Sequence, residues 1–179
     1  MSKPESGLFK GTTGVKDFYG DAESIIADRV KGLDLTPHPI KIKQLSSSKL
    51  AKLKRKIETR TATRDEYILY MWNKRFKKRR AKGVKDFWTA ETVRLKTGQK
   101  GTRAWTKEQR EEILKGRRAS FNGKTLQGHH AFSASKYPHL ANNHLVIYPA
   151  TSFEHIKGWH GGNYKKSEPG KRIRRIRKF

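Results

Sequence analysis

The stretch Gly128-His129-His130, with His155 and His160 further along the chain, decides the fold of this protein. Six of the seven histidines lie between His129 and His160. Adjacent side chains of a strand point to opposite faces, so one histidine of the pair can turn to a metal while the other faces an attacking water. A following helix that carries His155 can add further imidazole ligands. The pattern predicts a transition-metal site with one free histidine as a base.

The chain is strongly basic. It carries 42 Lys and Arg against 16 Asp and Glu, a formal net charge of +26 in 179 residues. Such an imbalance destabilises a compact state by self-repulsion unless a polyanion or an acidic partner is present. Nucleic acid is the partner that this charge favours. An acidic membrane surface is a weaker candidate, because no amphipathic stretch combines a broad apolar face with the charges.

The chain contains no cysteine. Disulfides and thiolate metal sites are therefore excluded, and a metal would be held by His, Asn, Asp or Glu side chains. No apolar run approaches the ~20 residues that span a bilayer, so we expect no stable membrane insertion. The N-terminus has no apolar signal core. Any export address is expected elsewhere, and the chain can be a fragment of a longer one.

Apolar periodicity predicts helices first and a strand–loop–strand–helix unit last. Three capping-box patterns mark helix starts, in which a Thr is followed three residues later by Glu or Gln. They are Thr63 with Glu66, Thr106 with Gln109, and Thr151 with Glu154. The predicted fold class is therefore α+β, with a helical N-terminal portion.

The expected elements follow from these starts and from glycine stops. Helices are expected from Asp21 to Gly32, from Ser47 or Ser48 through Ile57, from Thr63 to Gly83, over residues 86–96, and from Thr106 to Gly116. Asn122-Gly123 is a turn signal. Strands are expected over residues 124–127 and 145–148, and the last helix from Ser152.

Composition divides the chain into four parts. Residues 1–20, rich in Gly, Lys, Ser and Thr, are predicted to be a flexible linker or arm. Residues 21–100 are predicted to form a basic helical region, and residues 101–165 hold six of the seven histidines. Residues 166–179 form a basic tail.

Phosphodiester hydrolysis is a chemistry that such a histidine cluster can support. A water must lose a proton, and the added charge on phosphorus and on the departing oxygen must be stabilised. A neutral histidine near its ordinary pKa of ~6.5 can take the proton. One divalent metal can stabilise the charge. Together with the basic surface, the histidines predict an enzyme that cuts nucleic acid.

Several segments carry a resemblance. Gly128-His129-His130, Ile147-Tyr148-Pro149-Ala150-Thr151, Glu154-His155 and Trp159-His160-Gly161-Gly162-Asn163 resemble the GHH and WHH subgroups of the HNH nuclease superfamily. These are ββα-metal (His-Me finger) nucleases found as C-terminal toxin domains of bacterial polymorphic and contact-delivered toxins. The lead-in Trp105-Thr106-Lys107-Glu108-Gln109-Arg110 is similar too, so the resemblance spans roughly residues 101–164. It implies a C-terminal ββα-metal (HNH) finger over residues 101–165.

The resemblance also implies roles for single residues. His129 is implied as a metal ligand at the catalytic centre and His130 as the general base. His155 and His160 are implied as ligands from the helix. Two further residues are implied near the substrate, Gln127 close to the site and Arg103 on the scissile phosphate. The expected cofactor is one divalent metal ion, Zn, Ni, Mg or Mn, because imidazole ligands suit Zn or Ni and catalysis with a free base often tolerates Mg or Mn.

Two positions depart from the family pattern. Where the family often has an Asn that braces the loop, this chain has Val146, and Asn142 or Asn143 comes a few residues earlier. The helix-side histidines are five residues apart instead of four, so His160 reaches the metal only if the helix ends near Gly158. Asn163 or a water is the alternative ligand, and Asn163 is also a candidate substrate contact.

Basic runs are candidates for contacts to the nucleic-acid backbone. Lys77 and Arg79, in the run Lys77-Lys78-Arg79-Arg80, are predicted to bind substrate. A solvated charged face without any ligand is the alternative interpretation of this run. The same alternative applies to the tail Lys171-Arg172-Ile173-Arg174-Arg175-Ile176-Arg177-Lys178. The tail's alternation of Ile and Arg also suits an anionic lipid surface or an inhibitor.

The leading hypothesis is a metal-dependent, nonspecific DNase, with RNA as the less favoured substrate. It would be the toxic C-terminal domain of a secreted antibacterial toxin, delivered into the cytoplasm of a target cell. An acidic immunity protein would inhibit it. One alternative is a sequence-preferring phage or homing-type HNH endonuclease. The other is a non-catalytic basic nucleic-acid-binding protein with a structural metal site, which would be closed and four-coordinate.

Overall fold

The computed structural model describes residues 21–176, and it has the predicted α+β class. The helices are α1 (Asp21–Arg29), α2 (Ser47–Glu58), α3 (Arg64–Lys96) and α4 (Lys107–Leu114). The strands are β1 (Ser120–Phe121), β2 (Lys124–Thr125), β3 (Gln127–His130) and β4 (Ile147–Ala150). Two short 3₁₀ turns, η1 (Pro138–Leu140) and η2 (His144–Val146), and the π-helix η3 (Glu154–Trp159) complete the list. The predicted arm of residues 1–20 lies outside the described residues.

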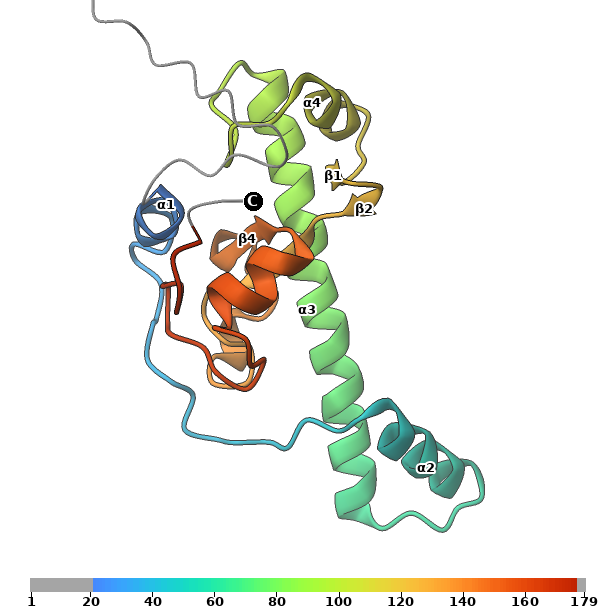
Figure 1. The fold of residues 1–179 in the computed structure, drawn as a ribbon. Helices are drawn as coiled ribbons and strands as arrows, with labels where there is room; N and C mark the ends of the chain where they lie inside the picture. The colour runs from blue at the N-terminus through green and yellow to red at the C-terminus, as the bar shows by residue number, and fades with distance from the viewer. Residues whose placement is uncertain (1–20, 177–179) are drawn as a thin grey trace, which may run out of the picture.

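Helix α3 is the axis of the molecule (Figure 1). It begins at the predicted capping box, in which Thr63 accepts from the backbone N–H of Glu66 and Glu66 accepts from that of Thr63. The prediction that Gly83 ends this helix is wrong, because α3 continues to Lys96. A β-carbon on Gly83 would lie 2.7 Å from the carbonyl oxygen of Ala141. Gly83 therefore marks a close approach of the helix to a loop, not a helix stop.

The histidine-bearing unit lies against the side of α3 (Figure 1). We call residues 127–160, which contain β3, β4 and η3, the finger. Strands β3 and β4 are antiparallel, with His129 opposite Tyr148 and His130 opposite Ile147. The first predicted strand, residues 124–127, is divided between β2 and β3. Because β3 continues to His130, both His129 and His130 lie within a strand. The second begins two residues later than predicted, because His144–Val146 forms a 3₁₀ turn.

Strand β3 contacts α3 through the glycine that precedes the two histidines. A β-carbon on Gly128 would lie 2.7 Å from both methyl groups of Val84. Only a residue without a side chain lets the strand approach the helix this closely. Gly128 therefore fixes the distance between β3 and α3.

The predicted turn at Asn122-Gly123 is confirmed. Asn122 and Gly123 both have positive φ, 48° and 71°, and they join β1 to β2 in a hairpin. Positive φ at both central residues matches the twist of the adjoining strands. The hairpin leads directly into β3.

One hydrophobic core unites helices and finger. Phe87 and Trp88 of α3 pack in one buried cluster with Ile113 of α4 and with Ile147 and Trp159 of the finger. Ile26 of α1 joins the same cluster. The core thus crosses residue 100, although the four-part division of the chain stays a prediction. In contrast, α2 has no buried residue and lies beside the first half of α3, away from α4 (Figure 1).

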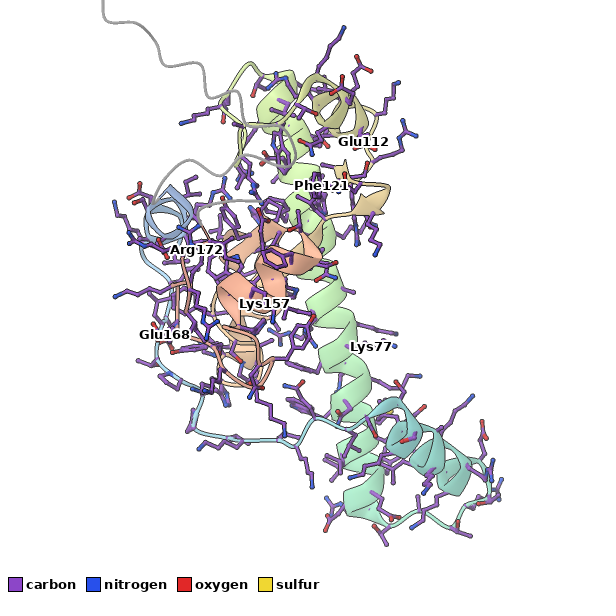
Figure 2. All side chains as sticks on the ribbon, viewed as in Figure 1. Lys77, Glu112, Phe121, Lys157, Glu168 and Arg172 are labelled. Atoms are coloured by element: carbon purple, nitrogen blue, oxygen red, sulfur yellow. The ribbon has the colours of Figure 1, made fainter. Side chains whose placement is uncertain are left out.

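Residues 165–176, which include the described part of the basic tail, fold back onto the finger. The backbone N–H of Gly170 donates to the carbonyl of Ala131, and that of Arg174 donates to the carbonyl of Gly158. Arg172 pairs with Glu23 of α1 at 3.2 Å, and Figure 2 shows it between α1 and the finger. This part of the tail therefore holds α1 to the finger.

The Glu23–Arg172 pair gives a pH-dependent contribution to stability. Burial alone would raise the pKa of Glu23, but hydrogen bonds and charge from Arg172 outweigh it and hold this pKa below its ordinary value of 4.5. A carboxyl with a depressed folded-state pKa stabilises the protein above its unfolded pKa, and loses that effect as pH falls through the folded value. Glu23→Gln should therefore lower the melting temperature at pH 7 and lower it less at pH 3. A constant difference at both values would contradict this account.

None of the helices among residues 21–176 is both long and apolar enough to cross a membrane.

Candidate metal centre and active site

The structure brings three predicted ligands together. His129 on β3 and His155 and His160 at η3 each offer a ring nitrogen, and these atoms all lie within 4.8 Å of one another. The Nε2 atoms of His155 and His160 are 3.2 Å apart. Three imidazoles at this separation suit one divalent transition metal.

The five-residue spacing of the helix-side histidines is explained by the type of helix. Residues Glu154–Trp159 form a π-helix, and the backbone N–H of His160 donates to the carbonyl of His155 at 3.1 Å. A π-helix closes i→i+5 hydrogen bonds, so residues five apart face the same side. On an ideal α-helix His160 would point away from His155. The wide turn therefore places both rings at one site.

Hydrogen bonds orient two of the three rings. The Nδ1–H of His155 donates to Oε1 of Gln127, whose amide nitrogen donates to the hydroxyl of Ser152. The Nδ1–H of His160 donates to the carbonyl of Lys166 at 2.7 Å. Donation from Nδ1 leaves Nε2 unprotonated for a metal and makes it more basic. Gln127, predicted near the site, is thus a support for His155.

His129 is held by aromatic packing. Its ring stacks on Trp159 with 4.4 Å between centroids, and only 3% of the residue is exposed. Trp159 also packs on Tyr148 and is therefore a core side chain. Burial, followed by repulsion from His155 and His160, holds the pKa of His129 well below its ordinary range. The ring is neutral at pH 7, which is the form that binds a metal.

His130 lies on the other face of β3, as strand alternation predicts. Its Nε2–H donates to the carbonyl of Ala141 at 2.9 Å, which leaves Nδ1 as a proton acceptor. Burial is the main reason that the pKa of His130 falls to about 4. The ring is therefore neutral at pH 7, and a bound phosphate anion would raise its pKa. This geometry suits a general base.

Helix α3 positions the loop that holds His130. Gly83 touches the Ala141 carbonyl, and one turn earlier the Nη2 of Arg79 donates to the carbonyl of His139 and to Oδ1 of Asn142. Arg79 is exposed and contacts this loop, and its predicted role in substrate binding stays a prediction. Asn142 accepts from Arg79, and Asn143 accepts from the backbone N–H of Leu145, so both candidate Asn residues brace the loop.

Gly83→Ala should impair catalysis more than metal binding. The new β-carbon would push the Ala141 carbonyl away from His130, whereas the three-histidine cluster lies elsewhere on the finger. A base displaced by about 1 Å can cost up to about 10²-fold in rate. We expect kcat for plasmid cleavage to fall roughly 10- to 100-fold with unchanged zinc affinity by calorimetry. Lys85→Ala, on the exposed side of the same helix, is the matched control and should change neither quantity.

Arg103 differs from its predicted role as a phosphate contact. It is 3% exposed and makes two 2.6 Å hydrogen bonds to the carboxylate of Glu154, with a third to the carbonyl of Pro149. Glu154 in turn accepts from the backbone N–H of Thr151, which completes the third predicted capping box. A guanidinium buried in this ion pair is unavailable to a phosphate. Arg103 instead fixes the start of η3.

Two further predicted residues have contacts of their own. Asn163 accepts from the backbone N–H of Lys165 and donates its own backbone N–H to the carbonyl of His160, so it forms a turn after that histidine. Its roles as a ligand or a substrate contact stay predictions. Lys77 lies on the middle of α3, where Figure 2 labels it, and lines a groove that His130 also lines.

Sequence reasoning missed several residues of the site. Arg80 and Arg118 line the same groove as Lys77 and His130. Arg80 belongs to the basic run of residues 77–80, but the sequence of that run does not indicate which of its members line the groove. Ala141 acts through its backbone carbonyl, which leaves no signal in the residue type.

A strand–strand–helix finger with three converging histidines and a fourth, separate histidine is the arrangement that the resemblance to HNH nucleases implies. Residues 71–151 match the model of a family described as "GHH signature containing HNH/Endo VII superfamily nuclease toxin", which confirms the predicted resemblance over this part of the chain. The match includes His129 and His130 but ends before His155 and His160. Searches of curated proteins and of solved structures each found no significant match.

Proposed function

We propose that this protein is a metal-dependent endonuclease that hydrolyses phosphodiester bonds of DNA without sequence preference. The observation that carries the proposal is the convergence of His129, His155 and His160 beside a fourth histidine whose Nδ1 is left as an acceptor. The match of residues 71–151 to a nuclease toxin family supports it.

His129, His155 and His160 would hold one divalent ion, Zn, Ni, Mg or Mn. When bound, such an ion supplies Lewis-acid stabilisation of charge on the phosphate and on the departing oxygen. Gln127 and the Lys166 carbonyl keep the ligand rings oriented. Trp159 supports His129 and shields that ring from water.

His130 would perform the proton transfer. Its Nδ1 accepts a proton from the attacking water as the new oxygen–phosphorus bond forms and the bond to the departing oxygen breaks. The departing oxygen takes a proton from solvent. The Ala141 carbonyl holds Nε2–H throughout, so the ring keeps its orientation and the positive charge of the protonated imidazole is stabilised. The proton then passes to solvent when the ring returns to its neutral form.

The competing functions predict different observations. Among the described residues the histidine cluster supplies three ligand side chains, one fewer than a closed structural zinc site. This favours catalysis over a purely structural metal. A sequence-preferring endonuclease would give a sharp pattern of cut sites on DNA, whereas the proposed enzyme cuts throughout.

Cleavage assays test the proposal. Purified protein should degrade plasmid DNA with added Mg²⁺, Mn²⁺, Zn²⁺ or Ni²⁺, and EDTA should stop the reaction. RNA is tested in parallel. Faster cleavage of RNA than of DNA would mean that the proposed enzyme is a ribonuclease. No cleavage of either polymer with any of these metals would refute the enzyme.

The biological setting is also part of the proposal. The protein would act in the cytoplasm of a target cell as the toxic portion of a larger secreted antibacterial toxin. A producing cell would need an immunity protein to protect its own DNA. That protein would be acidic, because a net charge of +26 on the toxin favours a negatively charged inhibitor. Such a partner should block plasmid cleavage in a way that weakens with added salt.

A further inference from the structure

A groove lies between the helices and the finger, next to His130. It has a volume of about 510 Å³ and is bounded by α2 and the segment before it, by α3 and by β3. Lys77, Arg80 and Arg118 line it, and none of its lining residues is an Asp or Glu. Three cations without a carboxylate make this a site for an anion.

The groove includes His130, the candidate base. His130 and Gln127 form its wall on β3, and Gln127 also holds the metal-ligand candidate His155. A phosphodiester placed between His130 and the metal cluster would therefore have its chain continue into the groove. The next phosphates of that chain would meet the cations.

The cations come from separate parts of the chain. Lys77 and Arg80 are on α3, whereas Arg118 lies on the segment between α4 and β1. Arg80 lies over the ring of Phe76, 5.9 Å from its centroid, which restrains the guanidinium. Arg75 and Lys78, on the same helix, do not line the groove. The fold thus selects particular members of the basic run.

We propose that this groove binds the polynucleotide strand adjacent to the scissile phosphate, through backbone phosphates that contact Lys77, Arg80 and Arg118. The inference rests on the proposed nuclease function and names the residues that would hold the strand next to the scissile bond. The volume lies within the ~300–1,000 Å³ of sites that enclose a drug-sized ligand. It therefore accommodates a short stretch of one strand.

The test compares a polymer with a diester too small to reach the groove. The rates are kcat/KM for a DNA oligonucleotide and for bis(p-nitrophenyl) phosphate, each with the same metal. Lys77→Ala, Arg80→Ala and Arg118→Ala should each lower the ratio of polymer to small-diester rate about tenfold, the equivalent of one lost charge-assisted hydrogen bond. The loss should lie mainly in KM. Each variant should also reduce the log–log salt slope by about 0.7–0.9.

Matched variants separate this site from general charge. Arg75→Ala and Lys78→Ala remove the same charge from the same helix and should leave the ratio unchanged. Arg80→Lys keeps the charge and should restore part of the ratio. Melting temperatures of all variants identify any loss of folding, and Lys77 and Arg118, both exposed, provide the test if Arg80→Ala is unstable.

The outcomes are distinguishable. If the wild-type protein hydrolyses neither substrate, the proposed function fails. If it hydrolyses both and the groove variants lower the two rates equally, or lower neither, the groove inference is overturned. Equal effects of groove variants and matched controls would overturn it as well.

Discussion

His130→Ala should lower plasmid cleavage by about 10²- to 10⁴-fold, the range typical for loss of a general base. The three candidate metal ligands would remain in place, because His130 points to the opposite face of β3 and is held by Ala141. Zinc affinity measured by calorimetry should therefore stay within a few-fold of wild type. The expected result is a folded, metal-binding and inactive protein.

His144→Ala is the matched control for this variant. His144 is half-buried in the connection between β3 and β4, which also contains Ala141, and it lies outside the metal cluster. Its replacement should leave cleavage close to the wild-type rate. A His130→Ala protein that kept more than about a tenth of the activity would place the base elsewhere.

Arg103→Ala should destabilise the protein by about 3–5 kcal/mol, because it leaves the buried carboxylate of Glu154 without its partner. The side chains of the pair are 1% and 10% exposed. For a domain of this size the loss corresponds to a drop of roughly 6–20 °C in melting temperature. Calorimetry or thermal denaturation followed by circular dichroism measures it.

A second variant separates stability from substrate binding. Arg103→Ala combined with Glu154→Gln removes the unpaired charge and should recover part of the lost stability. A direct phosphate contact predicts the opposite pattern, in which the melting temperature of Arg103→Ala is unchanged and KM rises. That pattern would restore the role first predicted for Arg103.

The local signals of the sequence were reliable where short-range chemistry controls structure. All three capping boxes form as predicted, and Asn122-Gly123 makes the hairpin turn. These features depend on hydrogen bonds between residues at most three apart, so a single sequence contains the necessary information. The candidate histidines were found in the same way, from residue type and spacing.

Tertiary contacts account for the differences. The local sequence predicts a helix stop at Gly83. The structure explains the glycine differently, because the Ala141 carbonyl, 58 residues later, leaves no room for a side chain there. Arg103 reads as a free cation, yet it pairs with Glu154, which is 51 residues away. The π-helix that brings His160 beside His155 likewise has no residue signature in the sequence. The differences at Gly83 and Arg103 arise because a distant segment meets a residue whose type alone suggests something else.

The most direct test of the metal centre is a titration of metal into EDTA-stripped protein while plasmid cleavage is followed. The account predicts no cleavage without metal and a rate that saturates near one equivalent of Zn²⁺ or Ni²⁺. A His129→Ala protein should not reach this rate at the same metal concentration. Cleavage that persists after EDTA, or metal binding without any cleavage, would contradict a catalytic metal held by His129, His155 and His160.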